Sequence, residues 1–196
     1  MKTELLLLAA GQSKRFSGVK QLADIQGQPM ICHCLSAYFQ GKNWLEGLDN
    51  GVVVLGANAG LIQKVLLNQI QVYLANSWQQ GMGHSLAESM PSLSNETSHV
   101  FIGLADQVAI TPLHIRQLLE TSAKYPERII AAEYAGRVGV PAIFPHQYFT
   151  QLAKLTGDKG AKALLEHSAD QVIKVPLPEA AFDIDTVDDL KSIMGS

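Results

Sequence analysis

The sequence predicts an α/β protein, a three-layer α/β/α sandwich whose central sheet is mostly parallel. Short apolar and β-branched runs alternate with helical stretches along the chain, which is the rhythm of βαβ units. The chain has 196 residues, of which 47% are hydrophobic. This length suffices for a substantial core, so we expect one domain over residues 1–196.

Seven runs have the length and composition of strands, namely Glu4–Ala9, Gly51–Leu55, Gln71–Leu74, His99–Leu104, Arg128–Tyr134, Pro141–Phe144 and Gln171–Val175. The first is a continuous apolar run, as expected of a parallel strand that is buried on both faces. Its end meets a small, basic loop, which is where open α/β sheets bind their ligands.

Seven stretches between these runs have helical character, namely Pro29–Gln40, Ala59–Asn68, His84–Met90, Pro112–Lys124, His146–Lys154, Lys159–His167 and Thr186–Ile193. Pro29 and Pro112 fall in first helical turns, where proline is well tolerated. Thr111 is a suitable N-cap for the helix Pro112–Lys124, and Asp158 is a suitable N-cap for the helix Lys159–His167.

The overall charge excludes several classes of partner. A net charge of −3 gives no electrostatic reason to expect binding to nucleic acid or to an anionic membrane. No apolar run approaches the length of a membrane span, and no signal-peptide cleavage pattern follows the first strand. We therefore expect a cytoplasmic protein.

Two cysteines flank a histidine in the triplet Cys32-His33-Cys34. This triplet invites a metal-site interpretation. However, residues one or two apart on a helix point in different directions and do not converge on one ion. We expect these cysteines to be buried or half-buried structural residues in a reducing compartment.

The loop after the first strand has the composition of a polyphosphate site. It reads Leu8-Ala9-Ala10-Gly11-Gln12-Ser13-Lys14-Arg15-Phe16, and Lys20-Gln21-Leu22 follow shortly after. The small residues let a ligand approach the backbone, Ser13 offers a hydroxyl, and Arg15 and Lys20 offer positive charge. The glycine spacing fits neither the P-loop nor the dinucleotide-binding fingerprint.

Two carboxylate-bearing segments are candidates for a metal site. The strand His99–Leu104 runs directly into Asp106, and Mg²⁺ prefers one or two carboxylates together with waters and substrate phosphates. The plain alternative for Asp106 is a loop or helix-start acid. Near the end of the chain, capping by Thr186 accounts for Asp188 and Asp189. It accounts less well for two other carboxylates, Asp183 and Asp185.

The opening pattern Leu-Ala-Ala-Gly-x-Ser-x-Arg-Phe, with Lys20 five residues after Arg15, resembles the MobA-like nucleotidyltransferases. Within them it is most similar to the molybdenum cofactor cytidylyltransferase branch. Four further segments resemble family elements in the same order, namely Asn76–Leu86, Ile102–Gln107, Gly157–Leu165 and Phe182–Leu190. The resemblance implies a Rossmann-like sheet of the nucleotide-diphospho-sugar transferase type.

The resemblance also implies the site residues. Nucleotide binding falls to Leu8, Ala9, Ala10, Gly11, Ser13, Arg15, Lys20, Asn76, Gly81 and Ser85. Arg15 and Lys20 are the implied catalytic residues: Arg15 holds the triphosphate and the leaving pyrophosphate, and Lys20 neutralises charge on the α-phosphoryl group. Asp106 and Asp185 are the implied Mg²⁺ ligands, with Asp183 as a neighbour or alternate.

This chain departs from the family pattern at three positions. Val108 and Val187 stand where the family usually has proline, and Val140 stands where the molybdenum cofactor enzymes often have histidine. Lys159 and Lys162 are candidates to face an anionic acceptor. His84 has two interpretations, a helix-start residue or a base, and phosphoryl transfer of this kind does not require the base.

The resemblance implies a Mg²⁺-dependent nucleotidyltransferase that uses CTP, because cytidylyl transfer goes with alanine at position 10 and guanylyl transfer with glycine. The implied acceptor is molybdopterin. Two alternatives remain. One is a sugar- or polyol-phosphate nucleotidyltransferase, which Val140 in place of histidine keeps open. The other is a non-catalytic carrier that delivers the molybdenum cofactor to a partner molybdoenzyme, although pure binding does not need two metal carboxylates.

Overall fold

The computed structural model describes residues 1–13, 15, 16, 18–68 and 70–194. Its centre is a seven-stranded sheet in the order β11-β9-β10-β8-β1-β6-β7. The strands are β1 (Thr3–Ala9), β6 (Asn50–Leu55), β7 (Gln71–Leu74), β8 (His99–Leu104), β9 (Ile129–Tyr134), β10 (Arg137–Pro145) and β11 (Val172–Pro176). Strand β10 is antiparallel to both of its neighbours, and the other pairings within this sheet are parallel.

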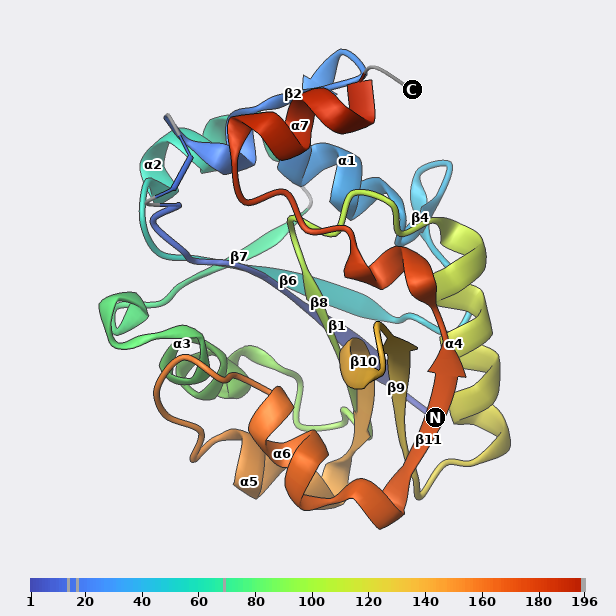
Figure 1. The fold of residues 1–196 in the computed structure, drawn as a ribbon. Helices are drawn as coiled ribbons and strands as arrows, with labels where there is room; N and C mark the ends of the chain where they lie inside the picture. The colour runs from blue at the N-terminus through green and yellow to red at the C-terminus, as the bar shows by residue number, and fades with distance from the viewer. Residues whose placement is uncertain (14, 17, 69, 195–196) are drawn as a thin grey trace.

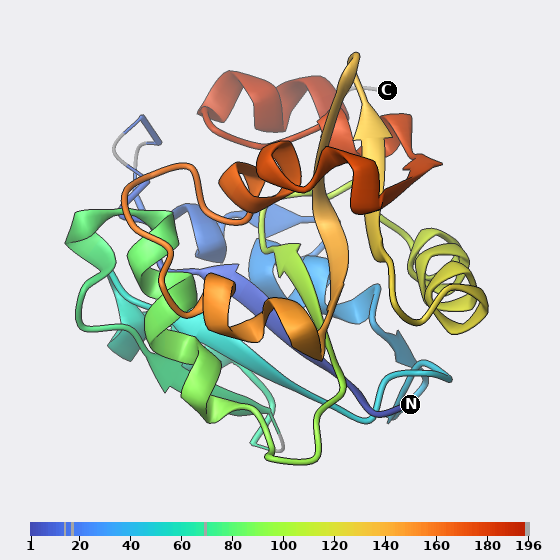
Figure 2. The same cartoon turned by 90° about the horizontal axis from the view of Figure 1, so that it is seen from below.

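Helices cover both faces of the sheet and complete three layers (Figure 1). Their bounds are α1 (Met30–Ser36), α2 (Ala59–Ile62), α3 (Met82–Ser89), α4 (Pro112–Lys124), α5 (Phe149–Leu152), α6 (Lys162–His167) and α7 (Val187–Met194). One layer contains α1, α2 and α4. The opposite layer contains α3, α5 and α6 and faces the viewer in Figure 2. The predicted α/β/α sandwich is confirmed.

Short elements complete the chain. Two small hairpins are formed by β2 (Asp24–Ile25) with β3 (Gln28–Pro29), and by β4 (Phe39–Gln40) with β5 (Asn43–Trp44). The single-turn 3₁₀ helices are η1 (Lys20–Leu22), η2 (Gln63–Val65), η3 (Trp78–Gln80), η4 (Met90–Ser92), η5 (His146–Tyr148), η6 (Ala169–Gln171) and η7 (Pro178–Ala181).

The side chains of β1 alternate between the two helical layers. Leu5 and Leu7 pack in the core with residues of α1, α2 and α4, whereas Leu6 and Leu8 pack with residues of α3, α5 and α6. Successive side chains of a strand point to opposite faces, so an unbroken apolar run is required where both faces are covered. Burial of each leucine contributes about 1.5–3 kcal/mol, which anchors β1 at the centre of the sheet.

Strand β1 marks the point at which the strand order reverses. The chain passes from β1 to β6 and β7 on one side, then returns to β8 on the other side of β1. Ligands of open α/β sheets bind outside the carboxyl ends of the strands at such a point. In the parallel register Leu8 lies beside Leu104, so the loops that follow β1 and β8 emerge next to each other.

Four predicted helices are shortened or divided in the structure. The stretch His146–Lys154 forms the 3₁₀ turn η5 followed by the short helix α5. The helix expected to reach Gln40 ends at Ser36, because Phe39 pairs with Trp44 in a hairpin and their rings stack at 4.2 Å. The helix expected from Lys159 begins at Lys162 with Ala161 as its N-cap, so Asp158 does not cap it. The stretch from Ala59 forms a short α-helix followed by a 3₁₀ turn.

At the start of α4, Thr111 and His114 form a capping box, as the position of Thr111 predicts. None of the described helices has the length and apolar character needed to cross a membrane.

Candidate active site

Gln21 holds the loop after β1 against the end of its own strand. Its side-chain amide donates to the backbone carbonyls of Ala9 and Gly11, each at 3.1 Å. Gln21 is buried, so these bonds are shielded from water and fix the loop in one shape. In the same loop, Ser13 has a left-handed φ of 58°. Its buried hydroxyl has no hydrogen-bond partner among the described residues, which leaves a polar group for a ligand.

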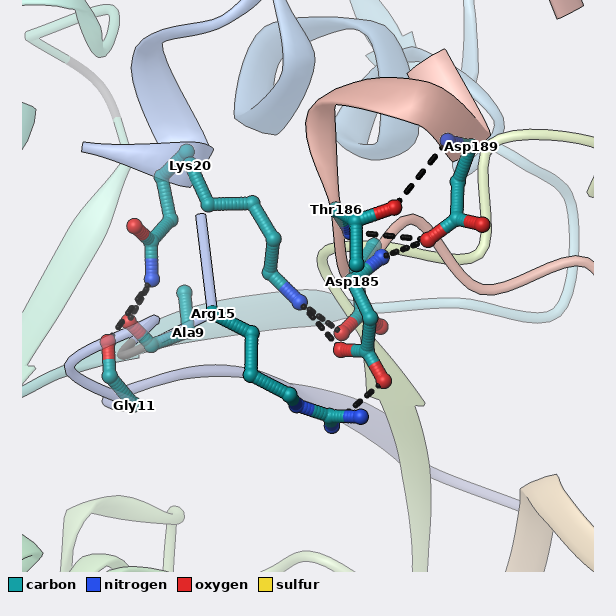
Figure 3. Close-up of polar contacts among 9 residues, drawn as sticks. Ala9, Gly11, Arg15, Lys20, Asp185, Thr186 and Asp189 are labelled. Carbon is teal, nitrogen blue, oxygen red and sulfur yellow. Dashed lines mark hydrogen bonds and ion pairs between the residues drawn. The ribbon is translucent and has the colours of Figure 1, made fainter. Parts of the chain in front are cut away.

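Two cations of this loop meet two carboxylates from distant parts of the chain. Lys20 Nζ lies 2.8 Å from Asp106 Oδ2 and 3.2 Å from Asp185 Oδ1. Arg15 Nη2 lies 2.7 Å from Asp185 Oδ2. Figure 3 shows Arg15 and Lys20 reaching from the opening loop toward Asp185 on the C-terminal segment. The fold therefore brings together the four residues for which the sequence predicts catalysis and metal binding.

The cluster keeps Lys20 charged although its side chain is only 10% exposed. Burial by itself lowers the pKa of Lys20, but the charge and hydrogen bonds of Asp106 and then Asp185 outweigh burial and raise that pKa. An isolated ammonium in such a place would be costly, and paired carboxylates compensate it. The pairing also lets two carboxylates lie near each other beside a buried cation.

The start of α7 positions Asp185. Asp189 Oδ2 accepts from the backbone N–H groups of Asp185 at 3.0 Å and Thr186 at 2.7 Å, and Thr186 Oγ1 accepts from the N–H of Asp189 at 3.2 Å. These reciprocal contacts form a capping box with aspartate in the usual place of glutamate (Figure 3). Thr186 and Asp189 thus have the structural role predicted, and they present the Asp185 carboxylate to the site.

Gln107 links the loop after β8 to two other parts of the site. Its side-chain amide donates to the carbonyls of Val140 at 3.0 Å and Ala180 at 2.8 Å. The backbone adds an isolated bridge between Gln107 and Asp183. This role has no signal in the sequence, because the two acceptors lie far away along the chain and no local pattern marks them.

Asp183 lies beside the metal-ligand candidates rather than among the contacts of Lys20. Burial, followed by repulsion from Asp106 and Asp185, raises the pKa of Asp183 to about 6. One of its oxygens is buried without a hydrogen-bond partner among the described residues. Of the two C-terminal candidates, Asp185 is therefore the one that meets Lys20 and Arg15.

A cavity of about 370 Å³ opens beside the cluster. Its lining consists of Leu8, Ala9, Ala10, Gly11, Ser13, Arg15, Lys20, Gln21, Trp78, Met82, Ser85, Leu104, Ala105, Asp106 and Asp185. The predicted site residues are among these, except Asn76 and Gly81. Trp78 and Met82 were not predicted. They belong to the short helices on either side of Gly81, within the segment Asn76–Leu86, so the resemblance of that segment to a family element was the available signal. Lys14 of the opening motif lies outside the described residues.

Asn76 and Gly81 do not line this cavity, and each has a local structural role. The backbone N–H of Asn76 donates to Glu88 Oε1 at 2.9 Å. Gly81 has a φ of 110°, and a Cβ atom there would lie 2.5 Å from the carbonyl oxygen of Gly157. Glycine at position 81 therefore lets the start of α3 pack directly against the loop before α6.

A second hollow of about 330 Å³ adjoins the first and shares Leu8, Met82 and Leu104 with it. Its remaining lining residues are Ile102, Tyr134, Arg137, Val138, Gly139, Val140, Asp158, Lys159, Ala161 and Lys162. The floor is therefore apolar and three cations surround it. Lys159 and Lys162 have Glu166 as an ion-pair partner at 4.0 and 3.7 Å, which at an exposed site is a weak interaction.

Other polar residues that the sequence singled out have structural contacts. His84 Nδ1 accepts from the backbone N–H of Gly157 at 3.0 Å and so ties α3 to the loop before α6. His33 Nε2 lies 2.9 Å from the carbonyl oxygen of Val108. Cys32 and Cys34 are free thiols. Within the described part of the chain, no group of three or more His, Cys, Asp and Glu residues could hold a metal ion.

Comparison with known sequences agrees with this geometry. A family model described as the MobA-like NTP transferase domain matches residues 5–172. Among curated proteins, the bifunctional protein GlmU of Heliobacterium modesticaldum is 29% identical over 125 residues, which is 61% of this chain and 25% of that protein. The chain thus spans about a quarter of the length of the curated relatives that it matches.

Solved structures share the fold along the full chain. Rv0371c from Mycobacterium tuberculosis H37Rv superposes with a TM-score of 0.79 at 24% identity, covering 100% of this chain and 98% of that one. CMP:2-keto-3-deoxy-manno-octonic acid synthetase in complex with CTP superposes with a TM-score of 0.77 at 15% identity, with the same coverage. At these identities the likeness shows the fold, and the nucleotide-diphospho-sugar transferase type expected from the sequence is confirmed.

Proposed function

The chain belongs to the MobA-like NTP transferase family, and on that premise we propose that it transfers a nucleotidyl group from CTP to a phosphorylated acceptor. The observation that carries this proposal is the cluster of Arg15, Lys20, Asp106 and Asp185 beside a cavity at the carboxyl ends of β1 and β8. Two cations and two carboxylates at a polyphosphate-sized opening are the parts that phosphoryl transfer needs.

In the proposed reaction an oxygen of the acceptor phosphate attacks the α-phosphorus of the nucleotide. The bond between the α-phosphorus and the oxygen that bridges to the β-phosphate breaks, and pyrophosphate leaves. Lys20 neutralises charge that develops on the α-phosphoryl group, and Arg15 holds the leaving pyrophosphate. Positioning and charge stabilisation carry the catalysis. The shape of the loop, fixed by Gln21, holds the small residues Ala9 to Gly11 against the nucleotide.

The donor set favours a hard divalent cation, and we assign its binding to Asp106 and Asp185. Carboxylate oxygens are the ligands that Mg²⁺ prefers, usually one or two from the protein with the rest from water and phosphate. Asp106 Oδ1 is buried and has no hydrogen-bond partner among the described residues, as expected of an oxygen reserved for a ligand. When bound, Mg²⁺ supplies charge neutralisation at the phosphates.

Three arguments support CTP over GTP as the donor. Ala10 lines the cavity, and its methyl group restricts room that a glycine would leave open for a purine. In the family, alanine at this position goes with cytidylyl transfer. CMP:2-keto-3-deoxy-manno-octonic acid synthetase, which shares the fold, was solved with CTP.

For the acceptor we propose molybdopterin, bound in the second hollow. That hollow has an apolar floor, three cations (Arg137, Lys159 and Lys162) against one carboxylate (Asp158), and Tyr134 as the uncharged polar side chain in its described lining. A sugar needs hydrogen-bonding partners for its hydroxyls, whereas a flat anionic molecule needs apolar surface and positive charge. Val140 in place of histidine is the observation that favours the alternative acceptor, a sugar or polyol phosphate.

The experiment is a pyrophosphate-release assay with CTP and Mg²⁺ and, in turn, molybdopterin, a sugar phosphate and a polyol phosphate as acceptor. The proposal expects release with molybdopterin that is abolished in Lys20→Ala. Release with only a sugar or polyol phosphate would establish the alternative acceptor. Binding of molybdopterin without pyrophosphate release with any of the acceptors would indicate the non-catalytic carrier.

A further inference from the structure

The two carboxylates of the proposed metal site are already engaged by cationic side chains. Asp106 Oδ2 and Asp185 Oδ1 contact Lys20 Nζ, and Asp185 Oδ2 contacts Arg15. Of the four carboxylate oxygens, the one without a hydrogen-bond partner among the described residues is Asp106 Oδ1. Two positive charges thus contact two negative ones, and the Asp183 carboxylate lies near enough to both aspartates to be repelled by them.

Lys20 has few alternatives to this arrangement. The residue is 8% exposed, and its ammonium is held by two carboxylates at 2.8 and 3.2 Å. A divalent cation bound by both carboxylates has to take an oxygen of Asp185 from Lys20 or Arg15, because both oxygens of Asp185 are engaged, whereas Asp106 can offer its free Oδ1. Such a cation would place two more positive charges beside the largely buried ammonium and weaken its contacts with the carboxylates, which is strongly unfavourable.

A nucleoside triphosphate removes this conflict. Its phosphate oxygens are new acceptors for Lys20 and Arg15, and their negative charge offsets that of the incoming cation. The carboxylates are then released to the metal at the moment when the triphosphate engages the two basic side chains. Because binding couplings are reciprocal, the metal must strengthen nucleotide binding by the same factor as the nucleotide strengthens metal binding.

We propose that Lys20 is a resident cation that holds Asp106 and Asp185 in the free protein and gives them up only to a metal that arrives with a nucleoside triphosphate. This inference rests on the proposed function, since it takes the two carboxylates as the metal ligands. It makes an unusual prediction: removal of this positive charge tightens the binding of a divalent metal alone while it weakens the response of that binding to nucleotide.

The test measures Mn²⁺ binding by the electron paramagnetic resonance signal of the free ion, without turnover. Wild type, Lys20→Met and Arg15→Gln are titrated alone and with a non-hydrolysable CTP analogue, after correction for Mn²⁺ bound by the analogue itself. Methionine preserves most of the buried stem of Lys20. Lys154→Met is the matched control, because it removes the same charge from an exposed residue outside the site.

We expect Lys20→Met to bind Mn²⁺ alone more tightly than wild type by about 5- to 150-fold, the usual range for coupled sites. Arg15→Gln frees only one carboxylate oxygen, so its Mn²⁺ affinity should lie between those of wild type and Lys20→Met. The Mn²⁺ affinity of Lys154→Met should equal that of wild type. The analogue should tighten Mn²⁺ binding to wild type far more than to Lys20→Met. A second substitution, Asp106→Asn, should abolish the gain in the Lys20→Met background.

Two results would overturn the inference: Mn²⁺ binding to Lys20→Met that is no tighter than to wild type, or wild-type binding that is equally tight with and without the analogue. If Lys20→Met does not fold by circular dichroism, Arg15→Gln and the wild-type comparison decide, because the Arg15 side chain is 73% exposed. Failure of the proposed function has a different signature, since wild type would then bind no analogue at all, with or without metal.

Discussion

Replacement of Gln107 by methionine tests whether the site is held together by this one buried amide. Methionine has a similar length and volume but donates no hydrogen bond. The substitution removes the bonds to Val140 at 3.0 Å and to Ala180 at 2.8 Å. It therefore removes the side-chain links from the loop after β8 to β10 and to Ala180, while the backbone bridge between Gln107 and Asp183 remains.

The expected loss of stability follows from these contacts. A buried carbonyl that loses its donor costs about 1–3 kcal/mol, which applies in full to Ala180 and in part to the half-buried bond with Val140. The buried Oε1 of Gln107, which has no hydrogen-bond partner among the described residues, disappears with the substitution and offsets part of the cost. We expect the free energy of unfolding to fall by about 2 kcal/mol on this accounting.

Urea unfolding followed by circular dichroism measures this change, with the slope m as a check that both proteins unfold in the same way. The matched control is Gln147→Met, since Gln147 donates one exposed bond to the carbonyl of Glu127 at 3.0 Å. We expect the control to stay within about 0.5 kcal/mol of wild type. A free energy of unfolding for Gln107→Met equally close to wild type would refute the reasoning.

Three further predictions concern the cluster and the donor. In Lys20→Ala, kcat/KM for CTP-dependent pyrophosphate release should fall by a factor equivalent to about 3 kcal/mol, whereas unchanged release would remove the role given to Lys20. Because the pKa of Asp183 is raised from 3.8 to about 6, the folded state binds more protons than the unfolded state between these values. The metal-free wild type should therefore lose stability relative to Asp183→Asn as pH rises from about 4 to about 6. A difference in the free energy of unfolding between the two proteins that stays constant across this pH range would contradict the raised pKa. Ala10→Gly should lower the ratio of CTP to GTP affinity measured by calorimetry, and an unchanged ratio would contradict the role given to the methyl group.

Much of the fold could be predicted because burial leaves a strong local pattern. The run Leu5 to Leu8 is apolar without interruption since both faces of β1 are covered. The observed β7, β8 and α4 have the bounds that the sequence predicts. Where a tertiary contact overrides the local pattern, prediction fails. Stacking of Phe39 on Trp44 ends a helix that periodicity would have continued.

The site, like the fold, has a part that could be predicted from the sequence and a part that could not. Residues that carry chemistry in a recognisable order, such as Arg15, Lys20 and Asp106, could be singled out from the chain alone. Their mutual contacts could not, because Lys20 and Asp185 are 165 residues apart and only the completed sheet brings the two segments together. The insertion of the Lys20 ammonium between the two carboxylates is likewise a property of the folded site, without any signal in the local sequence.

The most direct test of the central claim is calorimetric titration of CTP and of GTP, each with and without Mg²⁺, into wild type and Asp106→Ala. We predict that wild type binds CTP more tightly than GTP, that this binding requires Mg²⁺, and that Asp106→Ala loses it. Tighter binding of GTP would contradict the assignment of the donor. CTP binding that depends on neither Mg²⁺ nor Asp106 would contradict the assignment of the site.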